Sequence, residues 1–329
     1  MTTLVTGSSG HLGGGLMQVL PDAVGADLLP GPDTSVVGDL ADREVARRAL
    51  EGVDAVIHSA TLHKPHVGSH TRADFVAANV TATLNLLEES VAAGVSRFIF
   101  TSTTSAFGRA LTPGAGEPAA WITEDVVPRP KNIYGATKTA AEDLCELIHR
   151  DHGLPVLVLR TSRFFPEADD RPQARDAFDD LNLKVNELLY RRVDLADAVQ
   201  AHLDALERAP ALGFGRYIIS ATTPFSVADA AALHEDAPAV VARLFPAYED
   251  VFAARGWRML PTIERVYDNA RARRDLGWAP RFDFGSALEA LSRGEDPRSE
   301  LALRVGARGY HAEATGVYTT RPRLRNASR

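Results

Sequence analysis

Short apolar runs alternate along the chain with longer segments in which apolar residues recur at three- and four-residue spacing. The short runs are Thr3 to Thr6, Ala23 to Asp27, Ala55 to Ser59, Arg97 to Thr101, Val156 to Arg160 and Arg216 to Ser220. The segments with helical spacing include Leu12 to Leu20, Phe75 to Ala93 and Tyr134 to Arg150. This alternation predicts an α/β fold, in which a doubly wound parallel sheet is covered by helices on both faces.

The first strand runs directly into a glycine-rich turn, and a helical pattern follows it. Glycines allow backbone N–H groups to approach a pyrophosphate, which then lies at the positive end of the helix. Glycine-rich turns are common, but this one occupies the first strand-to-helix connection. It predicts a Rossmann-type dinucleotide-binding domain whose cofactor-binding residues include Gly7, Ser9, Gly10, His11, Leu12 and Gly13.

Asp27 ends the second strand, twenty residues beyond Gly7. At that distance a carboxylate accepts hydrogen bonds from ribose hydroxyls and repels a 2′-phosphate. No Arg or Lys lies between Asp27 and Arg43 to bind such a phosphate. The pattern favours NAD over NADP, with the alternative that Asp27 only caps a strand end.

The composition argues against several classes of binding partner. The chain is 45% apolar and 24% charged, with a formal net charge of −7, so it has no general attraction to nucleic acid or to anionic membranes. The single cysteine, Cys145, leaves no internal disulfide and no multi-cysteine metal site. The N-terminus does not resemble a signal peptide, and no apolar run approaches the roughly 18 residues that span a bilayer. We expect a cytoplasmic location.

The rhythm of strands and helices loosens after about Phe164, where Pro, Asp and Arg become frequent. We expect residues 1–165 to form the NAD-binding Rossmann domain, completed by a returning strand near 216–220. Residues 166–310 then form a smaller, partly helical substrate-binding portion packed over the strand ends. Residues 311–329 carry four arginines and little apolar periodicity, which predicts an extended tail.

Further motifs follow in a recognisable order: TGSSGHLG, Gly38-Asp39-Leu40, His58-Ser59-Ala60, Asn79 and Tyr134-Gly135-Ala136-Thr137-Lys138. From about Thr3 to Leu291 the chain resembles the extended short-chain dehydrogenase/reductase family of the NAD-dependent epimerase/dehydratase type. The resemblance implies that the cofactor is also contacted by Asp39, Leu40, Ser59, Ala60, Asn79, Tyr134 and Lys138.

The spacing of Tyr134 and Lys138 has its own physical logic. Residues four apart on a helix share one face, so the ammonium can lie near the phenol. A phenol has an ordinary pKa near 10 and is a poor base at neutral pH, but a nearby cation favours the phenolate. The alternative is a surface tyrosine with an unrelated lysine.

The segment TSTTSAFGRA, residues 101–110, places five hydroxyl side chains at the end of the predicted strand that begins at Arg97. Hydroxyls often close strands by bonding to nearby backbone groups. In the resembling family, one such hydroxyl binds the substrate oxygen beside the tyrosine, and alignment on Gly108 assigns this role to Thr103. Ser102 and Thr104 are one residue off and should point to the other face.

The chain also departs from the family pattern. Phe107 stands where sugar epimerases usually have tyrosine, and Arg163 stands where an asparagine would bind a diphosphate. The segment from Pro166 to Tyr190 is short and acidic, which argues against a large nucleotide pocket. The expected substrate-binding residues are His63, Thr103, Thr104, Arg163 and Arg192, with Lys64, His66 and Arg191 as further cations. The histidines lack the usual metal-ligand spacing, so no metal is expected, and Asp194 should cap a helix.

These features predict an NAD-dependent oxidoreductase or epimerase acting on an alcohol/ketone centre of a small, sugar-like, anionic substrate such as a sugar acid or sugar phosphate. Three alternatives stay open: a nucleotide-sugar 4-epimerase or dehydratase, an NADPH-dependent carbonyl reductase, and a non-catalytic dinucleotide-sensing protein. The family's helix pairing further implies a homodimer. The sequence does not separate epimerisation from dehydrogenation.

Overall fold

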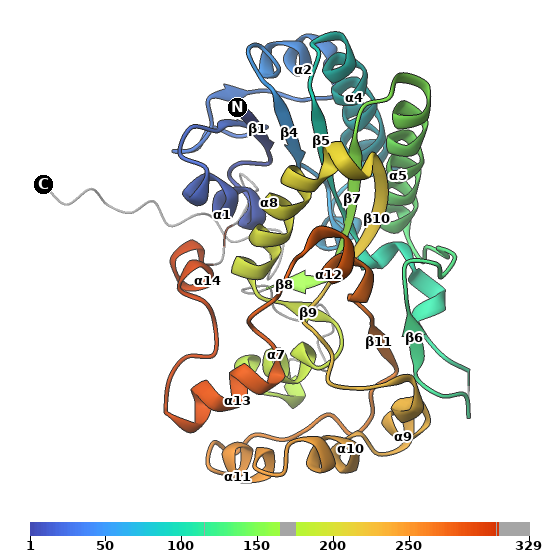
Figure 1. The fold of residues 1–329 in the computed structure, drawn as a ribbon, viewed down its shortest axis with the longest axis vertical. Coiled ribbons are helices and arrows are strands. Elements are labelled where there is room, and N and C mark those ends of the chain that lie inside the picture. The colour runs from blue at the N-terminus through green and yellow to red at the C-terminus, as the bar shows by residue number, and fades with distance from the viewer. Residues whose placement is uncertain (115, 165–175, 307, 309–329) are drawn as a thin grey trace, which may run out of the picture.

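A seven-stranded parallel sheet forms the centre of the molecule, seen here in a computed structural model that describes residues 1–114, 116–164, 176–306 and 308 (Figure 1). The strand order is β10-β7-β5-β4-β1-β2-β3, so the chain reverses direction across the sheet between β1 and β4. Open parallel sheets bind ligands at such a reversal. The strands are β1 (Thr3–Thr6), β2 (Val24–Asp27), β3 (Val36–Val37), β4 (Ala55–His58), β5 (Arg97–Thr103), β7 (Val156–Thr161) and β10 (Phe214–Ile219).

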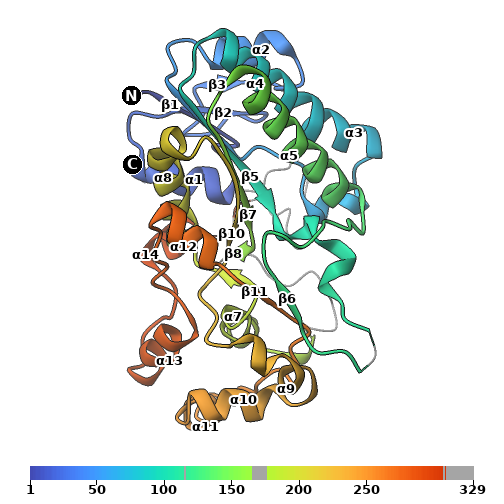
Figure 2. The same ribbon diagram turned by 45° about the vertical axis from the view of Figure 1, so that its right-hand side comes forward.

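Helices cover both faces of this sheet (Figure 2). One face packs against α1 (His11–Val19), α8 (Leu195–Leu212) and α12 (Ala270–Leu276). The other packs against α2 (Arg43–Ala49), α4 (Ala82–Ala92) and α5 (Ile133–His152). Burial on both faces explains why β1, β4 and β7 read as continuous buried runs without alternating polar positions. The predicted Rossmann-type fold is therefore confirmed.

Several segments of the C-terminal half of the chain lie beyond the carboxyl ends of the strands (Figure 1). Two short parallel ribbons occur there, in which segments distant in sequence pair: β6 with β11, and β8 with β9. The ribbon strands are β6 (Ala120–Ile122), β11 (Arg265–Tyr267), β8 (Arg163–Phe164) and β9 (Arg192–Val193). The accompanying helices are α7 (Asp180–Leu188), α9 (Ala230–Glu235), α10 (Ala237–Leu244), α11 (Tyr248–Ala253), α13 (Phe284–Ser292) and α14 (Glu300–Val305).

Most predicted elements are present, with two informative differences. Strand β5 extends to Thr103, two residues beyond the predicted end. The helical pattern from Phe75 to Ala93 is divided into α3 (Arg72–Val76), a π-helical stretch at Ala77–Thr81, and α4. The predicted tail, residues 311–329, lies outside the described residues. Across the described ranges, no helix is long and apolar enough to cross a membrane.

Helix α5 is attached to the sheet by a buried carboxylate. Glu142 accepts hydrogen bonds from Ser102 on β5 and from the Arg160 guanidinium on β7, with Nη2 to Oε2 at 2.8 Å. Arg216 of β10 also approaches Glu142, with Nε to Oε2 at 3.4 Å. Both the Glu142 and Arg160 side chains are almost completely shielded from solvent. Breaking such a pair leaves a charge buried without its partner.

We expect Glu142→Ala to lower the free energy of unfolding by about 3–5 kcal/mol in urea titrations, because Arg160 then stays buried without its carboxylate. Glu146→Ala is the matched control, since Glu146 pairs with the same Arg216 but its side chain is half-exposed. That control should change stability by less than about 1 kcal/mol. Equal losses in the two variants would contradict the prediction.

Candidate active site

The glycine-rich turn after β1 has the geometry that a pyrophosphate requires. Gly7 has φ +70°, and a Cβ there would lie 2.9 Å from the Ala60 backbone nitrogen. A Cβ on Gly13 would lie 1.9 Å from the Gly7 carbonyl oxygen. Gly10, which precedes α1, provides no side-chain cap, and the first turn of α1 carries no acidic residue. The N-terminal N–H groups of α1 therefore remain available to phosphate oxygens.

His11, within this turn, is a neutral and structural group. Burial, with smaller contributions from the charges of Arg308 and Lys184, lowers the pKa of His11 to about 3. Its Nε2 accepts a hydrogen bond from the Arg308 backbone N–H at 2.6 Å. The imidazole still lines the pocket, so the structure retains His11 as a candidate cofactor contact without positive charge.

Asp27 lies at the end of β2 and lines the same pocket. Its Oδ2 accepts a hydrogen bond from the Ser9 N–H at 3.0 Å, and its Oδ1 accepts one from the Leu29 N–H at 3.2 Å. The carboxylate therefore supports the phosphate-binding turn, and both oxygens keep lone pairs for ribose hydroxyls. Ser9 does not line the pocket, because its hydroxyl bonds to Thr34. Our prediction of a direct Ser9 contact is not supported.

A hydrogen-bonded chain fixes the backbone on the other side of the turn. The Thr6 hydroxyl oxygen accepts hydrogen bonds from the N–H groups of Ser59 and Ala60, both at 3.1 Å. Its single proton is therefore donated to His58 Nδ1 at 2.7 Å, and His58 Nε2–H donates to the Thr83 hydroxyl at 3.0 Å. Burial, and to a smaller extent the Lys138 charge, lowers the pKa of His58 to about 3, so this tautomer stays neutral. Ser59 and Ala60 are held in the pocket wall, together with Asp39 and Leu40.

The hydroxyl-rich end of β5 divides into side chains with different partners. Thr101 donates to His202 Nε2 at 2.9 Å, because His202 Nδ1 is committed to the Ala198 carbonyl. Ser102 donates to Glu142. Thr103 accepts a hydrogen bond from the Ser105 N–H at 3.1 Å, and among the described residues its own proton has no acceptor. Of Thr101, Ser102 and Thr103, Thr103 is therefore the hydroxyl best able to donate to a bound substrate oxygen.

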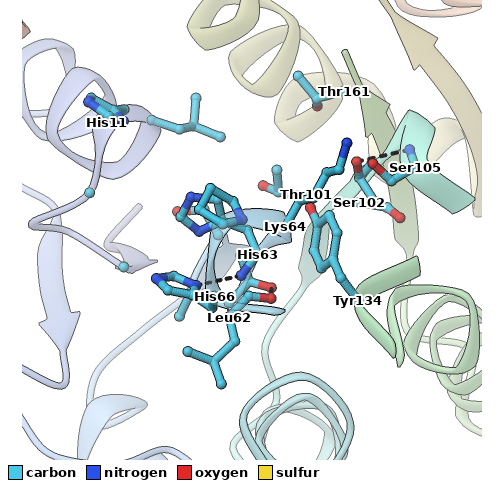
Figure 3. Close-up of a pocket in the computed structure, with 18 of the residues that line it drawn as sticks. His11, Leu62, His63, Lys64, His66, Thr101, Ser102, Ser105, Tyr134 and Thr161 are labelled. Carbon is cyan, nitrogen blue, oxygen red and sulfur yellow. Dashed lines mark hydrogen bonds between the residues drawn. The ribbon is translucent and has the colours of Figure 1, made fainter. Parts of the chain in front are cut away.

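Tyr134 reaches the pocket from the first turn of α5 (Figure 3). The helix begins at Asn132, whose side chain accepts a hydrogen bond from the Gly135 N–H at 3.0 Å. A Cβ on Gly135 would lie 2.9 Å from the Ser105 carbonyl oxygen, so the helix packs closely against the segment that follows Thr103. This close packing brings Tyr134 and Thr103 to the same pocket.

Asn79 supports this arrangement from outside the pocket. Its amide makes hydrogen bonds with Thr61, with both the N–H and the carbonyl of Leu62, and with Thr137 of α5. The side chain is buried and does not line the pocket. The predicted cofactor contact of Asn79 is therefore replaced by a structural role, which fixes the loop after β4 to α5.

Lys138 also lies outside the pocket lining. Its ammonium lies over the Phe100 ring, 3.9 Å from the centroid, and the side chain is buried. Burial lowers the pKa of Lys138 to about 7. The expected contact with the cofactor ribose is not present in this arrangement, in which Lys138 acts on its surroundings only through its charge.

Another lysine enters the pocket from the loop after β4. Figure 3 shows the Lys64 side chain extended across the pocket beside Tyr134, with His63 and His66 on the same short turn. His66 Nδ1 accepts a hydrogen bond from the His63 N–H at 2.8 Å, which keeps this turn in place. In the described part of the chain, no group of His, Cys, Asp and Glu side chains could hold a metal ion.

A fully buried carboxylate organises the arginines near β8 and β9. Glu187 pairs with Arg191, with Arg192 at 2.6 Å and with Arg163 at 3.5 Å. Arg163 and Arg191 line the pocket, whereas Arg192 is completely buried and also donates to the Phe164 carbonyl. Our prediction that Arg192 contacts substrate is therefore wrong, because its guanidinium is enclosed in the ribbon. Asp194 caps α8, as predicted.

The pocket thus brings together most of the predicted residues, which come from distant parts of the chain. Those that line it are Gly7, Gly10, His11, Leu12, Gly13, Asp27, Asp39, Leu40, Ser59, Ala60, His63, Thr103, Thr104, Tyr134 and Arg163. Ser105, Leu111, Ser162, Arg265 and Tyr267 also line it and were not predicted. Arg265 and Tyr267 alternate along β11, but such a short strand has no periodic signal that would have placed it at the site.

The model of the NAD dependent epimerase/dehydratase family matches residues 3–188. The chain belongs to this family. The match confirms the predicted family, its enzymatic character and NAD as the cofactor.

Curated relatives of the chain differ in their substrates. An uncharacterized protein of Sinorhizobium fredii is 32% identical over 169 residues, which are 48% of this chain and 40% of that protein. Sterol demethylase protein B of Methylococcus capsulatus is 26% identical over 332 residues, which are 89% of this chain and 98% of that protein. Uronate dehydrogenase of Pseudomonas syringae pv. tomato is 27% identical over 204 residues, which are 57% of this chain and 69% of that enzyme.

Solved structures share the fold. A short-chain dehydrogenase/reductase superfamily protein of Agrobacterium tumefaciens with bound NAD has a TM-score of 0.66 and 23% identity, covering 89% of this chain and 96% of that chain. UDP-glucuronic acid 4-epimerase of Bacillus cereus in complex with NAD has a TM-score of 0.60 and 20% identity, covering 89% and 99%. At these identities the likeness establishes the architecture alone.

Cofactor preference should depend on Asp27. Fluorescence titration should show NAD binding at least about tenfold tighter than NADP, because the carboxylate repels a 2′-phosphate. Asp27→Asn keeps an oxygen acceptor for the Ser9 N–H and removes the charge. The ratio of the NADP dissociation constant to the NAD dissociation constant should therefore fall. Asp22→Asn, an exposed position outside the pocket, serves as the control and should leave the ratio unchanged. Equal binding of NAD and NADP by the unmodified protein would refute the assignment.

Proposed function

We infer that the protein catalyses an NAD-dependent oxidation or epimerisation at an alcohol/ketone centre of a small, sugar-like, anionic substrate. The observation that carries this proposal is the shared position of Tyr134 and Thr103 in the pocket that also contains the phosphate-binding turn. The Thr103 proton has no acceptor there among the residues that the structure describes, and Tyr134 has the phenol that general acid–base chemistry uses.

The roles of the residues follow from their positions. Thr103 donates a hydrogen bond to the substrate oxygen, and Tyr134 takes or returns the hydroxyl proton. Lys138 lies one helical turn beyond Tyr134, and its protonated form, which is lost as pH rises through about 7, favours the phenolate. When bound, NAD would accept the hydride from the substrate and, in an epimerisation, return it. Asn79 and His58 position the surrounding backbone and touch neither reactant.

An anionic substrate is supported by the cations of the pocket. His63, Lys64, Arg163 and Arg191 line it on the side of β4 and β7, although Arg163 and Arg191 share the negative charge of Glu187. The similarity to uronate dehydrogenase supports a sugar acid. We keep Thr104 as a substrate contact, since it lines the pocket as well.

A sterol or steroid alcohol is the second candidate. The sterol demethylase relative matches nearly the whole chain, whereas the uronate dehydrogenase match covers little more than half of it. The positively charged side chains Lys64, Arg163 and Arg191 in the pocket favour the sugar acid, because their positive potential attracts an anion and does not attract an uncharged steroid. A nucleotide-sugar 4-epimerase is supported by similarity of fold and by an uncharacterized UDP-glucose epimerase of Bacillus subtilis that is 28% identical over 185 residues, about half of this chain.

Tyr134→Phe should lower turnover by roughly 100-fold or more while NAD binding stays nearly unchanged, because only the acid–base group is lost. Turnover is measured by NADH absorbance and by chromatography of epimerised product, with glucuronate, galacturonate, glucose 6-phosphate, UDP-glucose and a 3β-hydroxysteroid. Tyr248→Phe is the control, since Tyr248 packs between α10 and α11 outside the pocket. Reaction of the steroid alone would replace the sugar-acid proposal, and near-normal turnover of Tyr134→Phe would remove Tyr134 from the mechanism.

We further propose a cytoplasmic homodimer that pairs α4 and α5 with their counterparts. These helices lie side by side on one face of the sheet, and Leu147 of α5 is 37% exposed. Light scattering should give twice the 35.5 kDa chain mass. Leu147→Glu should yield monomers, whereas Leu303→Glu on α14 should not. A single-chain mass for the unmodified protein at micromolar concentration would rule the dimer out.

A further inference from the structure

The β6–β11 ribbon brings an arginine into the pocket from a part of the chain far from the Tyr134 region. Arg265 begins β11, pairs in register with Ala120 of β6 and lines the pocket with Tyr267, two residues further along the strand. Its side chain is 14% exposed, so the guanidinium is largely removed from bulk water. A cation in such a position requires compensating acceptors.

The described residues provide only part of that compensation. Arg265 Nη1 donates to the Leu111 carbonyl at 3.2 Å, and the same atom lies 3.7 Å from Glu264 Oε2. The Glu264 side chain is half-exposed and makes no hydrogen bond with this guanidinium. Arg265 Nε is buried without an acceptor, and no described residue accepts from Nη2. Nε and Nη2 form one edge of the guanidinium, a two-donor fork of which only Nη2 can be reached from the pocket, because Nε is completely shielded.

The other pocket arginines differ in this respect. Arg163 and Arg191 both pair with the buried Glu187, which neutralises part of their charge. Arg265 has no buried carboxylate beside it in the described part of the chain. Since a charged N–H donor forms its strongest hydrogen bonds with charged oxygens, the oxyanion of a carboxylate or phosphate is the ligand that would satisfy it.

We propose that Arg265 binds an oxyanion of the substrate, a carboxylate or a phosphate, through the Nη2 donor of its guanidinium. The proposal rests on the function inferred above and deepens it, because it assigns the anion to the β11 wall of the pocket in addition to Arg163. Tyr267 lines the pocket from the same strand, and its ring would lie beside the anion.

The first test is calorimetric titration of the NAD-loaded protein with inorganic phosphate. Arg265→Met keeps the length of the side chain and removes its charge, and it should weaken phosphate binding by about 10-fold or more, as expected for a lost charge-assisted pair. Arg265→Lys keeps the charge without the Nη2 donor and should give an intermediate loss. Arg271→Met is the matched control, because Arg271 pairs with Asp125 outside the pocket.

The second test compares KM for glucuronate and for glucose. Arg265→Met should raise the KM for glucuronate about 10-fold more than the KM for glucose, with a smaller effect on kcat, since the contact is remote from the reacting oxygen. Arg163→Met in the same assay shows how the anion is divided between the two arginines. Thermal unfolding of each variant shows whether it folds. If Arg265→Met does not fold, the KM values of Arg265→Lys test the proposal instead.

The outcomes separate this proposal from the proposed function. Loss of phosphate binding in Arg265→Met, with neither NAD reduction nor an epimerised product from any compound, would support the anion site and reject the proposed function. The proposal is overturned if the unmodified protein does not bind phosphate, if Arg265→Met binds it as tightly as the unmodified protein, or if Arg271→Met loses as much. It is also overturned if Arg265→Met raises the KM values for glucuronate and for glucose by the same factor.

Discussion

The buried carboxylate of Glu142 fixes the helix that carries Tyr134 against the strands that carry the rest of the site. It joins α5 to Ser102 of β5 and to Arg160 of β7, two neighbouring strands of the sheet. Thr103 follows Ser102 directly, so the same attachment determines how Thr103 lies relative to α5. Movement of the helix would separate the phenol from the hydroxyl and would also leave charges buried without partners.

Charge burial is a recurring feature of the pocket region. Glu187 pairs with three arginines. Glu142 pairs with two arginines and accepts a hydrogen bond from a serine. The imidazoles of His11 and His58 are instead kept neutral by burial. Within the described residues, Arg265 differs from these groups because its charge reaches the pocket with little compensation. A site arranged in this way stabilises an anion through a desolvated cation, where the attraction is stronger than in water.

Lys138 shows that helical spacing alone does not determine which side chains reach the pocket. Tyr134 and Lys138 share one face of α5, as their spacing requires, but only Tyr134 reaches the pocket. Phe100 of β5 lies beneath the lysine, and its ring attracts the ammonium into the protein interior. Lys64, from a loop far away in sequence, occupies the pocket beside the tyrosine (Figure 3). Which lysine faces the substrate side is therefore set by packing and not by the motif.

The sequence by itself determined the elements that depend on local chemistry. Apolar runs predicted the sheet strands, glycine spacing predicted the phosphate-binding turn, and Asp194 was recognised as a helix cap, because each depends on neighbouring residues. The contacts of Ser9, Asn79 and Arg192 were misjudged, since each depends on a partner distant in the chain, such as Thr34, Leu62 or Glu187. Arg265 and Tyr267 could not be assigned to the pocket for the same reason: β11 becomes a wall of the site only when it pairs with β6, and three residues of strand carry too little pattern to predict a partner more than a hundred positions away.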